Sequence, residues 1–187
     1  ASNDCLQDCA GEWGGSLELD DCGECGGNTE SEDECYVEDF DGNQYEIIAI
    51  GNQIWMTENL KVRHYKNGDE ILFVEEVLDA GSSGEWGSLS EGAFANYDNN
   101  PSNSDVYGNL YNGFTVHDER GVCPEGFHIP SEAEIEQLHW NIAPSPFYGI
   151  GQGGENAVTG GMLKEAGYEH WFSPNTGATN ESGFTAL

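Results

Sequence analysis

The sequence predicts an α+β fold that is rich in loops, and three features support this prediction. Two runs of β-forming residues between positions 45 and 56 meet at a two-residue turn, which is typical of a hairpin. A capping sequence at residues 130–134 opens a stretch with helical periodicity. The 187-residue chain contains 26 glycines, which predicts many turns between these elements.

Residues 1–36 are predicted to form an acidic arm that precedes a domain at residues 37–187. The arm contains neither Lys nor Arg and few aliphatic residues, so apolar burial alone cannot order it. Its crowded cysteines predict disulfide staples and an oxidising, extracellular setting. The disulfide candidates are Cys5, Cys9, Cys22, Cys25, Cys35 and Cys123.

The pairing of these cysteines stays open, because six cysteines allow about fifteen connectivities. Cys123 lies far from the others, and its nearest candidate partner is Cys35 if no thiol stays free. The alternative to disulfides is a four-thiolate zinc site, for which the first four cysteines have the paired spacing. Disulfides are favoured because the cysteine usage is typical of secreted proteins. The chain begins without Met or a signal segment, so we expect a processed product or a trimmed sequence.

The predicted hairpin at residues 37–61 is the first packed structure of the domain. Gly51-Asn52 joins its two runs, and both residue types tolerate the positive φ angles that hairpin turns need. Asp41-Gly42-Asn43 is a second turn just upstream. The apolar residues of the hairpin are Tyr45, Ile47, Ile48, Ile50, Ile54, Trp55 and Met56.

The remaining elements are two short strands and two helices. Strands are predicted at residues 71–74, as a buried run, and at 92–97, with a loop at 79–87 between them. A helix begins after Ser131, which forms a capping box with Glu134, and Pro144 ends it. A short helical piece is predicted at residues 159–166. The apolar face of the longer helix carries Ile135, Leu138, His139 and Ile142, and we expect His139 to be packed rather than a ligand.

Charge is the strongest global feature, with 35 acidic residues against 5 basic ones and a formal net charge of −30. This balance argues against nucleic acid and anionic membrane surfaces as partners, and no apolar run is long enough for membrane insertion. Bound Ca²⁺ would relieve the self-repulsion, and a solvated acidic surface is the alternative. The candidate calcium ligands are Asp20, Asp21, Asp98, Asn100 and Asp105; for the last three, a plain Asx-rich loop is the alternative.

Three segments, at residues 39–61, 107–131 and 163–187, resemble the Fibrobacter succinogenes major paralogous domain. Their motifs are DxDGNxYxxIxIGxQxWMxENLK, YGxLYNxxxVxDxRGxCPxGxHxPS and LKEAGxxHWxSPNTGATNESGFTAL. The resemblance implies a secreted or surface-displayed bacterial module with no assigned catalysis. Residues 8–27 are similar to Cys/Gly/Asp-rich repeats of large secreted bacterial proteins, which implies a spacer or arm.

The segment GFHIPSEAEI at residues 126–135 also resembles formylglycine-generating enzymes and their C-type-lectin-like relatives. This resemblance implies a loop-rich C-type-lectin-like domain with β-hairpins and one or two helices. It does not bring the enzyme's chemistry, because the enzyme's late copper-binding cysteine pair has no counterpart after Cys123.

The leading functional expectation is a non-enzymatic extracellular structural module. Family members usually continue past the segment that ends at Leu187, so we expect that the sequence is truncated, that the domain is shortened here, or that a neighbouring copy supplies the missing strand. The arm of a neighbouring copy could supply a strand, and such a head-to-tail contact builds a filament or surface layer. Partners would therefore be copies of the chain itself.

The alternative expectation is a calcium-dependent glycan-binding adhesion module of the lectin-like kind. Its candidate stacking residues are Trp86, Trp171, Tyr97, Tyr107 and Tyr111, each of which could instead be a core residue.

An enzyme is disfavoured, since no HExxH or GxSxG motif is present. We expect His117 to Arg120 to form a polar turn with a local ion pair, and Arg120 and Lys164 to pair with carboxylates. Asn180 opens the one glycosylation sequon, where a structural role is favoured.

Overall fold

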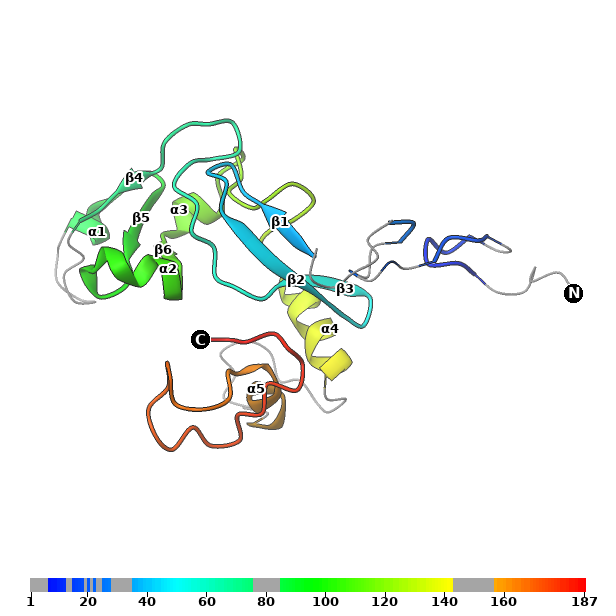
Figure 1. Ribbon diagram of the computed structural model, residues 1–187. Helices are drawn as coiled ribbons and strands as arrows, with labels where there is room; N and C mark the ends of the chain where they lie inside the picture. Colours follow the sequence, from blue (N-terminus) through cyan, green and yellow to red (C-terminus); the bar gives the residue numbers. More distant parts are fainter. Residues whose placement is uncertain are drawn as a thin grey trace, which may run out of the picture. The chain divides into compact units, whose positions relative to one another are not determined.

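The structure is a computed structural model of the chain, and it describes residues 7–12, 15–18, 20, 22, 25–27, 35–75, 85–142 and 157–187. The chain divides into two compact units, which are described separately (Figure 1). Unit 1 comprises residues 1–36, 46–57 and 135–186, and unit 2 comprises residues 37–45, 58–134 and 187. The division into arm and domain at residue 36 stays a prediction.

The strands and helices confirm the predicted α+β class. The strands are β1 (Tyr36–Glu38), β2 (Gln44–Ile50), β3 (Gln53–Met56), β4 (Leu72–Phe73), β5 (Ala93–Asn96) and β6 (Asn109–Tyr111). The helices are α1 (Glu85–Ser88), α2 (Ser104–Tyr107), α3 (Gly113–Val116), α4 (Glu132–Ile142) and α5 (Ala157–Leu163), with 3-10 turns η2 (Tyr97–Asn99) and η3 (Pro101–Asn103). Of the described helices, none has the length and apolar character needed to cross a membrane.

The predicted hairpin is formed by β2 and β3, which pair antiparallel with Ile50 opposite Gln53. Gly51 occupies the first turn position with a φ of +67°, which is the residue and position that a type II′ turn requires. β1 adds a third strand on the other side of β2, so the sheet has the order β1-β2-β3. The prediction of a hairpin at this turn is therefore confirmed.

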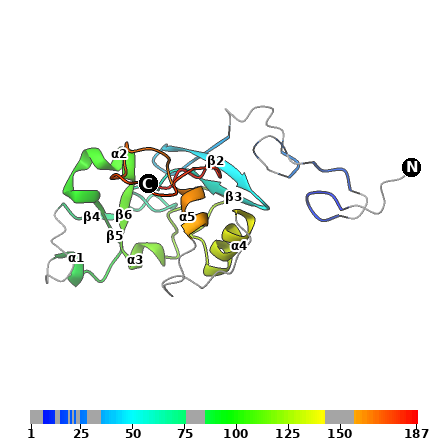
Figure 2. The ribbon, with the colours of Figure 1, turned by 90° about the horizontal axis from the view of Figure 1, so that it is seen from below.

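In unit 1, one face of the β2–β3 hairpin packs against later parts of the chain. The rings of Trp55 and Phe184 meet edge to face with centroids 5.8 Å apart. Gly183 lies so close to Ile48 that a Cβ at this glycine would be 2.7 Å from the isoleucine Cδ1. Asn141 of α4 donates a hydrogen bond of 2.9 Å to the Ile50 carbonyl, and both views show α4 beside the hairpin (Figures 1 and 2).

Helix α4 begins with the predicted capping box. The Glu134 carboxylate accepts from the backbone N–H and the hydroxyl of Ser131, each at 2.7 Å. These bonds hold the pKa of Glu134 down at about 2. Leu138 and His139 are buried on the apolar face, which confirms that His139 is a packed residue. The predicted helical piece at residues 159–166 is α5, shifted toward the N-terminus by two to three residues.

Unit 2 contains the second sheet, in which β5 lies between a parallel β4 and an antiparallel β6. The predicted strand at residues 71–74 is shorter than expected. Ile71 and Val74 are buried, but Leu72 and Phe73 between them are exposed, so the prediction of a continuous buried run is wrong. A two-residue strand at the side of a sheet has few neighbours to cover it, which explains the exposure. The core of unit 2 is Val62, Tyr65, Ile71, Phe94 and Val122.

A buried polar group in unit 2 fixes the turn upstream of the hairpin. The Asp39 carboxylate accepts from the backbone N–H groups of Asp41 and Asn43 and from the hydroxyl of Tyr45. The Tyr45 hydroxyl in turn accepts from the Lys61 N–H at 2.8 Å. Burial and the neighbouring Asp39 carboxylate raise the pKa of Tyr45 far above its usual value. The predicted turn at residues 41–43 is therefore confirmed.

Candidate functional site

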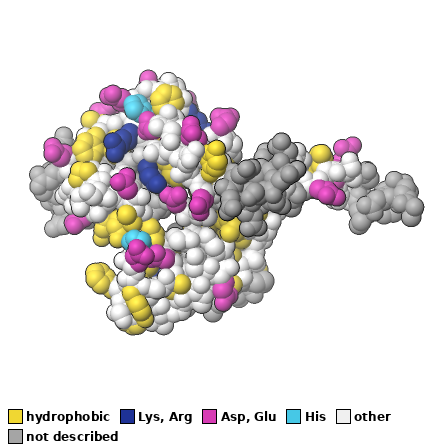
Figure 3. Space-filling model, viewed as in Figure 1, with side chains coloured by type: hydrophobic (Ala, Val, Ile, Leu, Met, Phe, Trp, Pro, Cys, Tyr) yellow, Lys and Arg dark blue, Asp and Glu magenta, His cyan; other side chains and the backbone are white. Residues whose placement is uncertain are grey.

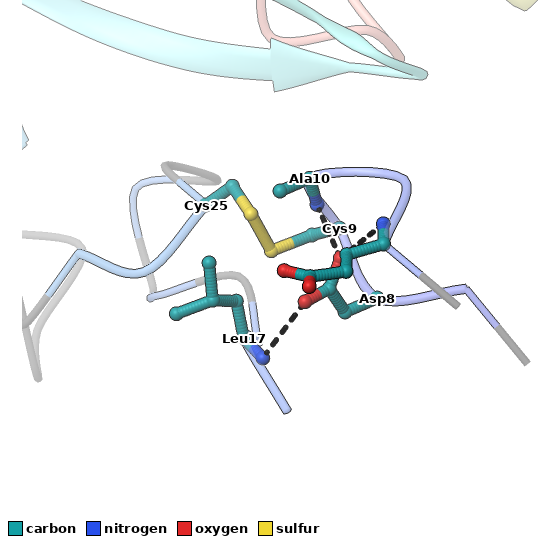
Figure 4. The surroundings of a disulfide bond; sticks show 6 residues. Asp8, Cys9, Ala10, Leu17 and Cys25 are labelled. Carbon is teal, nitrogen blue, oxygen red and sulfur yellow. Dashed lines mark hydrogen bonds between the residues drawn. A yellow bond between two sulfur atoms is a disulfide. The ribbon is translucent and has the colours of Figure 1, made fainter. Parts of the chain in front are cut away.

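Two disulfides hold the N-terminal segment, as predicted for the arm. Cys9 is bonded to Cys25 (Figure 4), and Cys22 is bonded to Cys35. These bonds rule out the zinc alternative, since three of its four thiolates are consumed. The pairing of Cys35 with Cys123 is also wrong, because Cys35 closes a shorter loop with a partner 13 residues away.

Cys123 is a free thiol, and burial raises its pKa. The remaining disulfide candidate, Cys5, lies outside the described residues.

The carboxylate of Asp8 organises the loop that carries the Cys9–Cys25 disulfide. It accepts from the backbone N–H groups of Ala10, Glu12 and Leu17, and the first and last of these residues are labelled in Figure 4. An acidic side chain of the arm thus serves as a local hydrogen-bond acceptor, since the arm has almost no apolar core.

The calcium candidates do not converge in the part of the chain that the structure describes. Asp20 accepts from the Cys22 N–H, while Asp21 lies outside the described residues. Asn100 uses its side-chain oxygen to accept from the Ser102 N–H, as a plain Asx turn does. Asp98 and Asp105 are exposed, and no three His, Cys, Asp or Glu side chains among the described residues are grouped to hold a metal. Calcium binding stays a prediction.

The predicted stacking aromatics are in three different settings. Tyr97 and Tyr107 form an edge-to-face pair with ring centroids 5.4 Å apart. Trp171 carries the Lys164 ammonium 3.6 Å from its ring centroid, so one of its faces is covered. The expected ion pair of Lys164 is therefore wrong, because the described part of the chain gives this cation a ring instead of a carboxylate. Tyr111 donates from its hydroxyl to the Val62 carbonyl at 2.6 Å and belongs with the core.

Asn180 has the contacts that a structural role needs. It adopts a φ of +50°, its side-chain oxygen accepts from the Thr185 N–H, and its amide donates to the Thr185 hydroxyl. Glycosylation of this sequon stays a prediction that these contacts do not favour.

Unit 2 contains two clefts, each of about 660 Å³, that share part of their walls. Trp86 and Phe114 line the first cleft, and Phe73 and Phe94 line the second. The shared residues are Glu91, Gly92 and Arg120, so the two clefts adjoin. We call the combined depression the aromatic groove.

Arg120 is the central cation of the aromatic groove. Its guanidinium makes ion pairs with Asp118 at 2.8 Å and with Asp69 at 2.9 Å, and it lies 3.7 Å from the centroid of the Tyr65 ring. The guanidinium holds the pKa of Asp118 down at about 2 and also lowers the pKa of Asp69. The predicted local ion pair is confirmed, and its acid is Asp118 rather than the adjacent Glu119.

The outer edge of β3 in unit 1 has no paired strand among the residues that the structure describes. Residues that face each other across an antiparallel pair alternate between hydrogen-bonded and non-hydrogen-bonded. Thr57 N donates to Glu46 O at 2.9 Å and fixes this alternation, so Ile54 and Met56 point their N–H and C=O groups away from β2. Within the described chain, no hydrogen bond reaches these outward groups.

On the opposite side of the same sheet, the outward backbone groups of β2 are paired with the chain around β1. Ile47, which faces Met56 across the ladder, donates from its N–H to the Cys35 carbonyl at 3.1 Å on the β1 side. The chain that follows the second disulfide thus already extends the sheet at one edge. At the other edge, the outward backbone groups of β3 have no partner in the described part of the chain.

An apolar face lies beside this free edge. Side chains alternate between the two faces of a strand, so the residues on the face opposite Trp55 form one set. Each of its four members is partly or fully exposed, and they are Ile47, Ala49, Ile54 and Met56.

The sequence predicted the hairpin but not its free edge. An edge is a property of which strands are neighbours, and the apolar alternation of residues 53–56 is the same for a central and an edge strand. Phe114 and Glu91 of the aromatic groove were also missed, because no local motif marks them.

Comparison with known proteins identifies a family but no annotated relative. No curated protein and no solved structure matches the chain. The model of the Fibrobacter succinogenes major domain matches residues 48–187, which is three quarters of the sequence and includes all three motif segments except the first nine residues of the earliest one. The chain therefore belongs to the Fibrobacter succinogenes major domain family.

Proposed function

We propose that this chain is an extracellular, non-enzymatic structural module that assembles head to tail by adding a strand from one copy to β3 of the next. The observation that carries this proposal is the row of backbone groups at Ile54 and Met56 that point away from β2 and have no partner among the described residues. A free strand edge is a template for another extended chain, and main-chain hydrogen bonds supply the affinity of such contacts.

The occupant that we propose is the N-terminal segment of a second copy. Residues 1–36 precede the part of the chain that the family model matches, so they are the segment that one copy could donate to the next. β1 supports this choice, because the end of that segment already pairs with β2 within one copy. A contact between two different surfaces does not close on itself, so it generates a filament.

The exposed apolar face next to β3 supports the same contact. A strand added to the edge places alternate side chains beside Ile54 and Met56, and burial of apolar area stabilises association by about 25 cal/mol per Å². Ile47 and Ala49 extend this face across β2.

The acidic surface makes cations part of the proposal. Figure 3 shows Asp and Glu side chains spread over the visible described surface, with few Lys and Arg among them. Two copies of charge −30 repel each other, and the repulsion weakens as salt screens it or Ca²⁺ binds. We therefore propose that assembly depends on Ca²⁺ or on high ionic strength.

The proposed extracellular location is supported by the two disulfides, since such bonds persist in oxidising compartments. The C-type-lectin-like form of the α+β fold also belongs to the proposal, and the resemblance at residues 126–135 supports it. The absence of HExxH and GxSxG motifs from the sequence supports a non-enzymatic role.

The test replaces the outward N–H of β3 without touching the hairpin ladder. Ile54→Pro removes one donor that points to solvent, which an edge strand tolerates, and Ile54→Val is the matched control that keeps the donor. Negative-stain microscopy and light scattering in CaCl₂ should show filaments of the original chain and of Ile54→Val, and dispersed monomers of Ile54→Pro.

Circular dichroism should show that Ile54→Pro remains folded. Two results would overturn the proposal: dispersed monomers of the original chain under every salt and Ca²⁺ condition, or filaments of Ile54→Pro equal to those of the control.

A further inference from the structure

We infer that the aromatic groove of unit 2 binds a neutral oligosaccharide, a second role that is independent of assembly through β3. Figure 3 shows hydrophobic side chains gathered in patches on the described surface. The groove consists of two adjoining clefts, each with aromatic side chains in its wall, and all of its lining residues belong to unit 2.

Aromatic rings are available at both ends of the groove. Phe114 is 52% exposed at the first cleft, where Trp86 also forms part of the wall. Phe73 is 44% exposed at the second cleft, and its ring is held by Phe94 with centroids 5.1 Å apart. The apolar faces of sugar rings bury well against such side chains, and two aromatic settings in one groove suit a chain of sugars better than a single ring.

Polar groups with unused hydrogen-bonding capacity accompany the rings of the first cleft. Within the described chain, the Glu91 carboxylate, the His117 imidazole and the Ser90 hydroxyl make no hydrogen bond, and all three line the first cleft. Together they offer acceptors and donors to sugar hydroxyls, which can both donate and accept.

Asn112 provides the contrast within the same cleft. Its side-chain oxygen accepts from Ala93 N and Thr115 N, and its amide donates to the Glu91 carbonyl. This side chain is therefore committed to holding the wall in place, while Glu91, His117 and Ser90 face the ligand.

Charge selects a neutral sugar over an acidic one. Arg63 and Arg120 supply two positive charges, and four carboxylates at or beside the groove supply four negative ones: Asp69, Glu70, Glu91 and Asp118. Arg120 is already paired with two of these carboxylates, so it cannot offset a phosphate, sulfate or uronate without losing a partner. Polyanions are repelled, and a cationic peptide is the competing ligand that the test must separate.

The test is affinity electrophoresis of the Ile54→Pro chain, so that assembly does not affect migration. Gels contain soluble β-glucan, xylan or galactomannan as neutral probes, and heparin or polylysine as charged probes. The expected result is retardation by at least one neutral polysaccharide and not by heparin, while polylysine, which binds any strongly acidic surface, should retard the parent and a groove variant alike. Trp86→Ala combined with Phe114→Ala is that groove variant, and it should weaken binding of the neutral polysaccharide at least about tenfold, as loss of central contact residues does.

Phe172→Ala is the matched control, because Phe172 is an aromatic residue with 98% exposure in unit 1. It should bind the neutral probe as the parent does. The inference is overturned if no neutral gel retards the chain, if heparin binds instead, if the double variant loses its retardation by polylysine, or if it binds the neutral probe like the parent. Filament formation by the original chain would be unaffected by any of these outcomes, so the two proposals fail separately.

Discussion

The two sheets have the same number of strands and differ in how their edges end. In unit 2 the outer edge of β6 is covered by its own chain, because Asn109 N donates to the Leu60 carbonyl at 2.9 Å. In unit 1 the outer edge of β3 keeps the free groups of Ile54 and Met56 within the described chain. A strand edge that its own chain covers leaves side chains for recognition, whereas an open edge also offers its backbone.

The largest expected effect is on stability, and it tests whether the core of unit 2 is packed more tightly than the β3 edge of unit 1. Tyr65 is 1% exposed and lies under the Arg120 guanidinium, so Tyr65→Ala should cost about 3–5 kcal/mol of unfolding free energy in a denaturant titration. Ile54→Ala at the open edge is the partner variant, and its half-exposed side chain should cost no more than about 1 kcal/mol. An equal loss of unfolding free energy at the two positions would contradict the contrast between the packed core of unit 2 and the open edge of β3.

The next effect concerns the staple that precedes the open sheet. Cys22 and Cys35 are 13 positions apart in the sequence, and replacing both by Ala opens the loop that their disulfide closes. This change should lower the free energy of unfolding by about 3 kcal/mol. Limited proteolysis should then cut residues 7–35 faster while residues 85–134 of unit 2 stay resistant. Cleavage of both regions at the same new rate would show that the staple supports the whole molecule rather than the arm.

A smaller effect is expected at the buried polar group of unit 2. Tyr45→Phe removes the hydroxyl that donates to Asp39 and accepts from Lys61 N, so about 2 kcal/mol should be lost. Tyr36→Phe in β1 is the matched control, because the Tyr36 side chain is exposed. Thermal unfolding should separate the two variants, and identical midpoints would mean that the buried hydrogen bonds add nothing.

The smallest effect lies at the start of α4. Ser131→Ala removes the N-cap and should cost about 1 kcal/mol at pH 7. The pKa of Glu134 is lowered to about 2 in the folded chain, so its contribution is complete above its usual value near 4.5 and is lost as pH falls toward 2. Unfolding curves of the original chain and of Glu134→Gln should therefore converge at low pH. A difference that grows on acidification would contradict this sign.

Local features of the fold were predictable from the sequence. The hairpin turn at Gly51, the capping box at Ser131 and the buried His139 were all found correctly, because each depends on residues within a few positions of one another. Turn chemistry and helix capping act at that range.

Features that depend on distant neighbours were not predictable. Cys35 has five other cysteines of equal chemistry to choose from, and it is bonded to Cys22 rather than to Cys25, which is nearer in sequence. Lys164 has many acidic residues to choose from, yet it lies on the ring of Trp171. The aromatic groove brings Phe73 into one cleft with Arg120, which is more than 40 positions away, and no local pattern encodes this approach.

Amide hydrogen exchange at Ile54 and Met56 tests the central claim most directly. The amides should exchange quickly in dispersed chains and become protected in material assembled with Ca²⁺, because an added strand bonds to them. The Asn109 amide should be protected in both states, since its own chain already covers it. Fast exchange of Ile54 and Met56 in assembled material would contradict assembly through the edge of β3.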